Sequence, residues 1–386
     1  MIIRNIMVFK WYYFFWRFKP LAALMAIYFS QITNSYAQAM GIFSVFNISY
    51  MLLKLPSGYI SDKIGRKPVI ICGSFLLFIS FLTLAISGEY KIVNLLFLFA
   101  FLWGIGEALI SGSTDALMYE TMDELKRSNE FKFLYSRSMV SDQLGCGLAA
   151  LTTMFITYYF SLQTVAWFAV FPSLFQFMAS LYFIEASKKR KTTKLAQNNI
   201  FLVLKQFIRN KKLCFYAIMD IFFGTLGDVS HRFEGIYFKT FATDWIISLA
   251  RVLKHMFGVL GFYLIPYIKR YKPEKLYFGS IICNLFFRIL SLIFNNIFSP
   301  FIHIFLNFFY ATGATAKTDI LQHEFLASYR ASGQSIILFI KSLFMALVMY
   351  LIGIIADLWG IFSAMVILVI LRVIGLSMAF IWSRYN

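Results

Sequence analysis

Apolar runs recur along the whole chain and are separated by short polar stretches. An α-helix needs about 20 apolar residues to cross the hydrocarbon core of a membrane, and the runs have this length. Because the backbone finds no water in hydrocarbon, only helices and closed barrels can cross it. The pattern predicts an all-α membrane protein with twelve transmembrane helices, over residues 7–29, 38–60, 68–87, 93–114, 135–157, 163–184, 212–231, 245–268, 276–294, 298–316, 333–356 and 360–381.

Composition agrees with this class. Hydrophobic residues make up 60% of the 386 and charged residues 14%, whereas soluble domains have about 45–50% and about 25%. The net charge of +18 is explained by basic residues that stay in cytoplasmic loops, so nucleic acid is not expected as a partner. The four cysteines are far apart and lack the spacing of a metal site, so no metal and no cofactor are predicted.

The first span must begin well before Leu21. Residues 21–60 would be used up by two spans of about 20 residues, with no turn left between them. An earlier start places Arg17 toward the middle of the membrane. Ala37 and Ala39 imitate a signal-cleavage site, but cleavage there would delete a span, so we expect the first helix to be retained.

Basic residues also predict the orientation of the chain. Most Lys and Arg fall on the side that holds the N-terminus, whereas the opposite loops contain only Lys91, Arg232 and Lys239. We expect the protein in the plasma membrane, and the positive-inside rule then predicts that both termini lie in the cytoplasm. A basic loop on that side can also contact anionic membrane lipid.

One long polar segment, "EASKKRKTTKLAQNN", divides the chain near its midpoint. It predicts an N-terminal six-helix bundle over residues 1–186, a cytoplasmic linker over 187–211 and a C-terminal six-helix bundle over 212–386. A short repeat supports two related halves: "LYSRSMVSDQL" opens the fifth span and "ASYRASGQSII" the eleventh, with Arg137 and Arg330 at matching places.

The turn between the second and third spans, "GYISDKIGRKPVI", crowds charge between two apolar runs. Gly58 allows close approach of a neighbouring helix, and Gly65 supplies a position where φ can be positive. Asp62 can accept hydrogen bonds from a helix start, while Arg66 and Lys67 hold the turn at the cytoplasmic face. These residues are interpreted either as a gate or as an anchor that only fixes orientation.

This turn resembles the signature G-x-x-x-D-x-x-G-R-K of the major facilitator superfamily. "GIGEALISGSTDALMYETM", "HEFLASYRASGQS" and "GIIADLWG" are similar to segments of bacterial exporter-like members. The resemblance implies two pseudo-symmetric bundles around a central cavity, with access alternating from side to side. It also implies that Asp62 and Arg66 lock the halves on the cytoplasmic side. Antiporters of the family often carry a Gly/Pro-rich fifth span; here Gly145 and Gly147 stand without proline, so the transport direction stays open.

Ionisable residues inside spans are expensive and mark a pathway or a partner. In the family layout the third, sixth, ninth and twelfth spans lie outside the cavity, and the last two carry only Arg288 and Arg372. The residues predicted for the substrate or proton pathway lie in other spans and are Arg17, Glu107, Arg137, Asp142, Asp220, Asp228, Lys254, His255 and His303.

Two stripes of these residues leave an alternative open. Asp220 and His231 share one face of the seventh span, and Arg251 and Lys254 share one face of the eighth. The two stripes either pair permanently or form a proton-coupled switch in which an aspartate changes partner as it titrates. Glu107 either binds a cation or proton or neutralises Arg17.

The sequence thus predicts a secondary active transporter, active as a monomer, that exports a small organic molecule in exchange for protons. Uptake by a symporter or facilitator of the same fold is the nearest alternative. A transporter-like sensor or a membrane-embedded enzyme is a further alternative, but no clustered catalytic set supports an enzyme, and no phosphate-binding loop supports ATP as the energy source.

Overall fold

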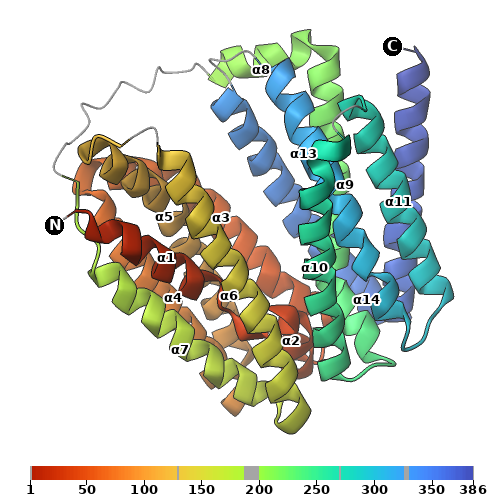
Figure 1. Cartoon of the computed structure of the whole chain (residues 1–386). Helices are drawn as coiled ribbons and strands as arrows, with labels where there is room; N and C mark the ends of the chain where they lie inside the picture. The colour runs from red at the N-terminus through yellow and green to blue at the C-terminus, as the bar shows by residue number, and fades with distance from the viewer. Residues whose placement is uncertain (1, 128–129, 187–199, 269–270, 326–329, 386) are drawn as a thin grey trace. The chain divides into compact units, whose positions relative to one another are not determined.

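The structure, a computed structural model, describes residues 2–127, 130–186, 200–268, 271–325 and 330–385. Within these ranges the regular structure is helical and contains no β-strand (Figure 1). The chain divides into two compact units, one of residues 1–34 and 38–193, the other of residues 35–37 and 194–386. Of the predicted linker, residues 187–199 lie outside the described residues, and the remainder begins the second unit.

In its described residues the first unit contains eight helical elements. They are α1 (Arg4–Arg17), the short 3-10 helix η1 (Pro20–Ala23), α2 (Met25–Thr33), α3 (Tyr36–Ile64), α4 (Arg66–Tyr90), α5 (Val93–Glu124), α6 (Phe131–Tyr159) and α7 (Leu162–Leu181). Within this unit α4 packs along α5 and α7, and α1 packs along α6 and α7.

The second unit contains α8 (Ile200–Arg209), α9 (Lys211–Lys239), α10 (Asp244–Ile268), α11 (Pro273–Ile293), α12 (Ser299–Ile302), α13 (Ile304–Glu324) and α14 (Arg330–Tyr385). α13 packs against both α10 and α11, and α9 packs against α14. α14 covers the last two predicted spans and is kinked at Gly360, where φ is +82°. Glycine tolerates this left-handed conformation better than other residues.

All twelve predicted spans are helical in the described residues, but the first is not one continuous helix. α1 ends at Arg17, and Pro20, which has no N–H to donate, begins η1. Thr153 on α6 donates its hydroxyl to the Pro20 carbonyl, so the break does not leave that oxygen without a partner. The expectation of a single helix over residues 7–29 is wrong, because the chain opens at the point where Arg17 and Lys19 need partners.

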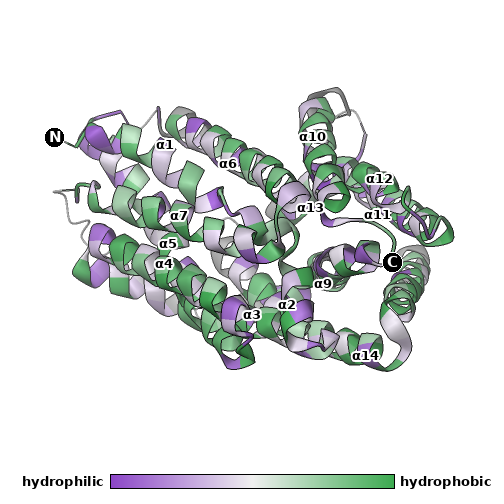
Figure 2. Ribbon diagram, turned by 90° about the horizontal axis from the view of Figure 1, so that it is seen from below, coloured by the Kyte–Doolittle hydropathy of each residue, from purple (hydrophilic) through white to green (hydrophobic). Residues whose placement is uncertain are grey.

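Eight helical stretches of the described chain are long and apolar enough to cross a membrane, and one of them, Gly333–Ile381, covers two predicted spans. The first, eighth and tenth predicted spans are not among them. The first and tenth are interrupted, and α10 carries Arg251 and Lys254. Figure 2 shows that hydrophobic residues dominate the helices, with hydrophilic residues scattered among them.

Large apolar side chains are exposed along several helices. Phe155, Phe171 and Leu347 are each more than half exposed. A water-soluble protein rarely presents so much apolar surface, whereas hydrocarbon solvates it well. The exposed surface is therefore that of a membrane protein, as the sequence predicted.

Candidate functional site

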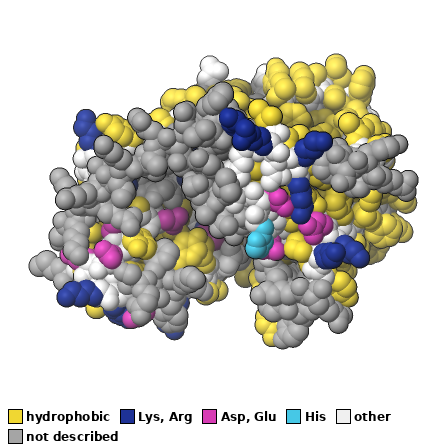
Figure 3. All heavy atoms as spheres, turned by 90° about the horizontal axis from the view of Figure 1, so that it is seen from above, with side chains coloured by type: hydrophobic (Ala, Val, Ile, Leu, Met, Phe, Trp, Pro, Cys, Tyr) yellow, Lys and Arg dark blue, Asp and Glu magenta, His cyan; other side chains and the backbone are white. Residues whose placement is uncertain are grey.

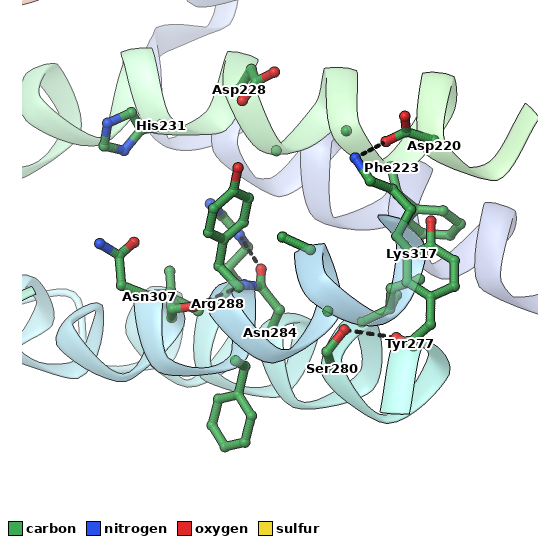
Figure 4. A pocket seen from close by; sticks show the side chains of 18 of the residues that line it. Asp220, Phe223, Asp228, His231, Tyr277, Ser280, Asn284, Arg288, Asn307 and Lys317 are labelled. Carbon is green, nitrogen blue, oxygen red and sulfur yellow. Dashed lines mark hydrogen bonds and ion pairs between the residues drawn. The ribbon is translucent and has the colours of Figure 1, made fainter. Parts of the chain in front are cut away.

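A cavity of about 330 Å³ lies inside the second unit, between α9, α10, α11, α13 and α14. This volume lies in the range of about 300–1,000 Å³ that is usual for small-molecule sites. In Figure 4, α9 with Asp220 and Asp228 runs along one side, and α11 with Asn284 and Arg288 runs along the other. The charged and histidine side chains that line it are Asp220, Asp228, His231, Lys254, His255, Arg288, Lys317, Lys341 and Arg372.

Two aspartates of α9 form ion pairs with lysines from other helices. Lys317 on α13 donates to Asp220 over 2.8 Å, and Lys341 on α14 lies 2.8 Å from Asp228. The Asp220 carboxylate is buried, whereas the Asp228 side chain is 47% exposed. A Cβ atom at Gly224, between the two aspartates, would lie 2.8 Å from the Lys341 ammonium. Gly224 therefore makes room for this lysine.

A second charge cluster surrounds Glu234, near the other end of α9. Its carboxylate accepts from Lys254 over 2.7 Å, and lies 3.3 Å from an Arg288 nitrogen and 3.4 Å from His303. His231 lies 3.2 Å from the same carboxylate. Side-chain exposure is 3% for Glu234, 8% for Lys254 and 7% for Arg288. Glu234 therefore compensates two buried cations at once.

Sequence reasoning missed Glu234, because the predicted span ended at residue 231 whereas α9 continues to Lys239. The signal was present: Glu234 lies three residues beyond His231, on the same face as Asp220. The two stripes meet at His231, which contacts Arg251 and Lys254. Lys254 pairs with Glu234, whereas Asp220 and Asp228 pair with lysines of α13 and α14.

Two arginines share one neutral acceptor beside the cavity. The Asn284 amide oxygen accepts from Arg288 over 3.0 Å and from Arg372 over 3.2 Å. Two further nitrogens of Arg372, Nε and Nη2, are buried and have no hydrogen-bond partner among the described residues. Arg288 and Arg372 line this cavity inside the second unit, whereas the layout predicted for the ninth and twelfth spans concerns the central cavity and stays a prediction.

The first unit holds its own charge pairs around the break in its first span. Lys19 donates to Glu107 over 2.5 Å, and Trp16 and Trp103 donate to the same carboxylate over 3.0 and 3.1 Å. Arg17 donates to Asp142 over 2.6 Å. Glu107 thus neutralises Lys19 rather than Arg17.

The sequence profile described as "Major Facilitator Superfamily" matches residues 12–316. The chain belongs to the major facilitator superfamily. Membership makes the protein a multi-pass membrane protein of a transporter superfamily.

The curated relatives of this superfamily member are transporters of unassigned substrate. The uncharacterized transporter BU466 of Buchnera aphidicola subsp. Acyrthosiphon pisum (strain APS) is 24% identical over 242 residues, which are 63% of this chain and 53% of that protein. An uncharacterized transporter of Buchnera aphidicola subsp. Schizaphis graminum (strain Sg) is also 24% identical, over 252 residues. The chain spans about half the length of these relatives.

Solved structures share the superfamily fold. A nucleoside transporter, NupG, superposes with a TM-score of 0.79 at 14% identity, covering 100% of this chain and 99% of that one. A D-xylose–proton symporter superposes with a TM-score of 0.74 at 15% identity, covering 98% and 96%. At these identities the likeness concerns the fold.

The superfamily signature forms a compact charged turn at the start of α4. Arg66 contacts Asp62 and donates to Glu120 over 3.2 Å. The backbone N–H groups of Arg66 and Lys67 donate to the Glu185 carboxylate over 2.8 and 2.6 Å. Glu185, and not Asp62, therefore caps this helix start, where the free N–H groups favour a negative charge.

The two signature glycines differ in their surroundings. Gly65 has φ +107°, and a Cβ there would lie 3.2 Å from the Glu185 carboxylate, so the capped turn needs glycine. A Cβ at Gly58 would meet no described atom within 4 Å. Gly58 thus lies on an open part of the α3 surface within its unit.

The predicted pathway residues fall into three places. Asp220, Asp228, Lys254 and His255 line the cavity of the second unit, and His303 lies beside it, buried against Glu234. Arg17, Glu107 and Asp142 belong to the charge pairs of the first unit. Arg137 is exposed on α6.

One end of the second unit carries a further group of charges. Lys212 lies 3.1 Å from Glu274 and 2.9 Å from Glu324, and Figure 3 shows side chains of both signs gathered at this end. In the described ranges, no three His, Cys, Asp or Glu side chains are grouped so that they could hold a metal ion.

Proposed function

We propose that this superfamily member is a secondary active transporter that exports a small organic molecule in exchange for protons, by alternating access. The observation that carries the proposal is the charged cavity of the second unit. Its aspartates, Asp220 and Asp228, each have a lysine partner on another helix. Charged side chains inside a membrane are retained where they bind a substrate or carry an ion.

The ion pairs of the cavity provide a physical basis for proton coupling. Protonation of Asp220 removes its attraction for Lys317, which then becomes free to bind another group. Asp228 and Lys341 can work in the same way, and the half-exposed Asp228 is the easier of the two aspartates for a proton to reach. Protonation of an aspartate and binding of a substrate would thereby depend on the same ion pair, which couples their movements.

The more completely bonded carboxylates have a different proposed role. Glu107 has three donors and Glu234 compensates two buried cations. Removing a proton acceptor of this kind would leave buried cations unpaired, at a cost of about 3–5 kcal/mol. We assign both to holding their helices in place rather than to carrying protons.

We further propose that Gly58, Asp62, Gly65, Arg66 and Lys67 form a cytoplasmic gate. The Arg66 side chain already bridges Asp62 on α3 and Glu120 on α5. A guanidinium held between two helices can exchange one carboxylate partner for another at modest cost, because its fork offers five donors.

The same proposal places both termini in the cytoplasm and the basic loops against anionic lipid in the plasma membrane, with the monomer as the functional unit. Orientation is tested by labelling single cysteines introduced near each terminus in intact cells. Protection of both termini from an impermeant reagent is expected. Labelling of either one from outside contradicts the orientation.

Uptake by proton symport is the second candidate. It is favoured by one of the similar solved structures, which is described as a D-xylose–proton symporter. Proteoliposomes with an imposed pH gradient separate the two. With a pH gradient imposed, protons flow from the acidic side to the alkaline side. Exchange predicts that substrate moves toward the acidic side, whereas symport predicts that substrate moves toward the alkaline side. Substrate movement that no pH gradient alters would refute proton coupling.

A further inference from the structure

We infer that the molecule transported through this site is a small organic anion, whose carboxylate or phosphate group is bound by Arg372 and Arg288. The inference rests on the proposed function, because it names the substrate class of the same cavity. It starts from an unusual feature of the second unit: a buried arginine that has no acidic partner within hydrogen-bond or ion-pair distance among the described residues.

Arg372 is only 5% exposed and lines the cavity. Its one hydrogen bond among the described residues goes to the neutral Asn284 amide oxygen, which Arg288 also uses. The Nε and Nη2 groups of Arg372 therefore have no acceptor in the described part of the chain. Buried polar groups are nearly always hydrogen-bonded, and an unpaired buried charge is costly. An acceptor from outside the chain would remove this cost.

Arg288 is also incompletely paired. Its Nη1 group lies 3.3 Å from Glu234, but this contact lacks the alignment of a hydrogen bond. Glu234 is shared with Lys254, which takes the shorter contact of 2.7 Å. The two guanidinium groups thus share the Asn284 oxygen, and of the two only Arg288 lies near a carboxylate, which leaves donors for a further acceptor.

The charge of the whole cavity points the same way. Its lining includes five cations, Lys254, Arg288, Lys317, Lys341 and Arg372, and two anions, Asp220 and Asp228. With Glu234 added as the third anion, the difference is 5 − 3 = +2. A bound group with one or two negative charges would neutralise this excess.

The shape of the donors specifies the kind of anion. Guanidinium groups present parallel N–H donors that match the oxygens of a carboxylate or phosphate. Gly227 on α9 leaves space beside Arg372, because a Cβ there would lie 3.6 Å from its Nη2. Phe223, Tyr277 and Phe309 also line the cavity and can pack against the organic part of the molecule. The volume of about 330 Å³ limits the ligand to a small molecule.

Calorimetry tests this inference by measuring equilibrium binding to the purified full chain in nanodiscs of phosphatidylcholine, a zwitterionic lipid with no net charge. The probes are inorganic phosphate, succinate and benzoate. Erythritol and 1,4-diaminobutane serve as neutral and cationic controls. We expect saturable binding of at least one anion and of neither control. Arg372→Gln should weaken binding about 10- to 100-fold, because it removes a charge-assisted hydrogen-bonding group.

Three further variants separate ligand binding from folding. Arg372→Lys keeps the charge but loses the fork, so it should bind more weakly than wild type and more tightly than R372Q. Asp228→Asn removes a negative charge from the half-exposed edge of the cavity and should tighten anion binding. Arg127→Gln, at an exposed arginine paired with Glu130 outside the helices of the cavity, is the matched control and should leave binding unchanged.

The inference is overturned if no anionic probe binds the wild type or if a control compound binds instead of the anions. It is also overturned if R372Q and R127Q change the binding affinity equally. Displacement of succinate by phosphatidylglycerol in the nanodisc would also overturn it, because a lipid headgroup would then be the occupant. The two proposals fail separately. Flux of an uncharged molecule would support the transport function and contradict the anionic substrate, whereas anion binding without flux would support the anion site and contradict transport.

Discussion

Replacement of Glu234 by glutamine should destabilise the second unit strongly. Glutamine keeps the shape and the hydrogen-bonding capacity of glutamate but removes its charge. Lys254 and Arg288 are 8% and 7% exposed at the side chain, so neither can turn to water when the carboxylate charge is lost. Breaking a buried ion pair by removing one partner costs about 3–5 kcal/mol. We expect a loss of this size.

Chemical denaturation of the full chain in detergent, monitored by tryptophan fluorescence, measures the effect. The companion variant Lys254→Met removes the cation that Glu234 contacts most closely. If the cost of E234Q arises from an uncompensated charge, the double variant should be more stable than E234Q alone, because a buried pair can be replaced by apolar groups at little net cost. Glu130→Gln, at an exposed pair, is the control and should change stability by less than about 1 kcal/mol. A loss below about 1 kcal/mol for E234Q would refute the structural role assigned to Glu234.

Two other predictions concern glycine and helix capping. Gly224→Ala places a Cβ 2.8 Å from the Lys341 ammonium, so it should displace this lysine from Asp228 and slow transport several-fold in proteoliposomes. Gly279→Ala is the control and should transport normally, because its Cβ meets no described atom within 4 Å. Equal transport rates for the two variants would contradict the packing around Gly224. Glu185→Ala removes the acceptor of two backbone N–H groups at the start of α4. It should lower the free energy of unfolding by about 1–2 kcal/mol in the same denaturation assay. An unchanged denaturation midpoint would show that this cap does not stabilise the protein.

Much of the fold could be predicted because hydrocarbon leaves a chain few options. Length and hydropathy of the apolar runs located twelve spans, and the signature around Asp62 and Arg66 indicated the superfamily that the sequence profile identifies. The break at Pro20 was missed because hydropathy averages over a window and does not register a local loss of helical bonding. The long helix across Gly360 was divided correctly into two spans.

The candidate site was predicted less completely. Asp220, Asp228 and Lys254 were found because a charge inside an apolar run is conspicuous. Their partners were not found, since pairing depends on which helices pack together. Lys317 and Glu234 both lay just beyond the predicted ends of their spans. Arg372 was not counted among the pathway residues because the family layout places its span outside the central cavity, whereas its side chain lines the cavity inside the second unit.

Proton movement measured with a pH-sensitive dye inside proteoliposomes tests the central claim most directly. The wild type, Asp220→Asn and Asp319→Asn are compared with the same substrate. Asp319 is a half-exposed aspartate of α13, paired with His323 and not part of the cavity lining. We predict substrate-dependent proton movement in the wild type and in D319N, and its loss in D220N. Proton movement that persists undiminished in D220N would show that Asp220 is not the coupling residue.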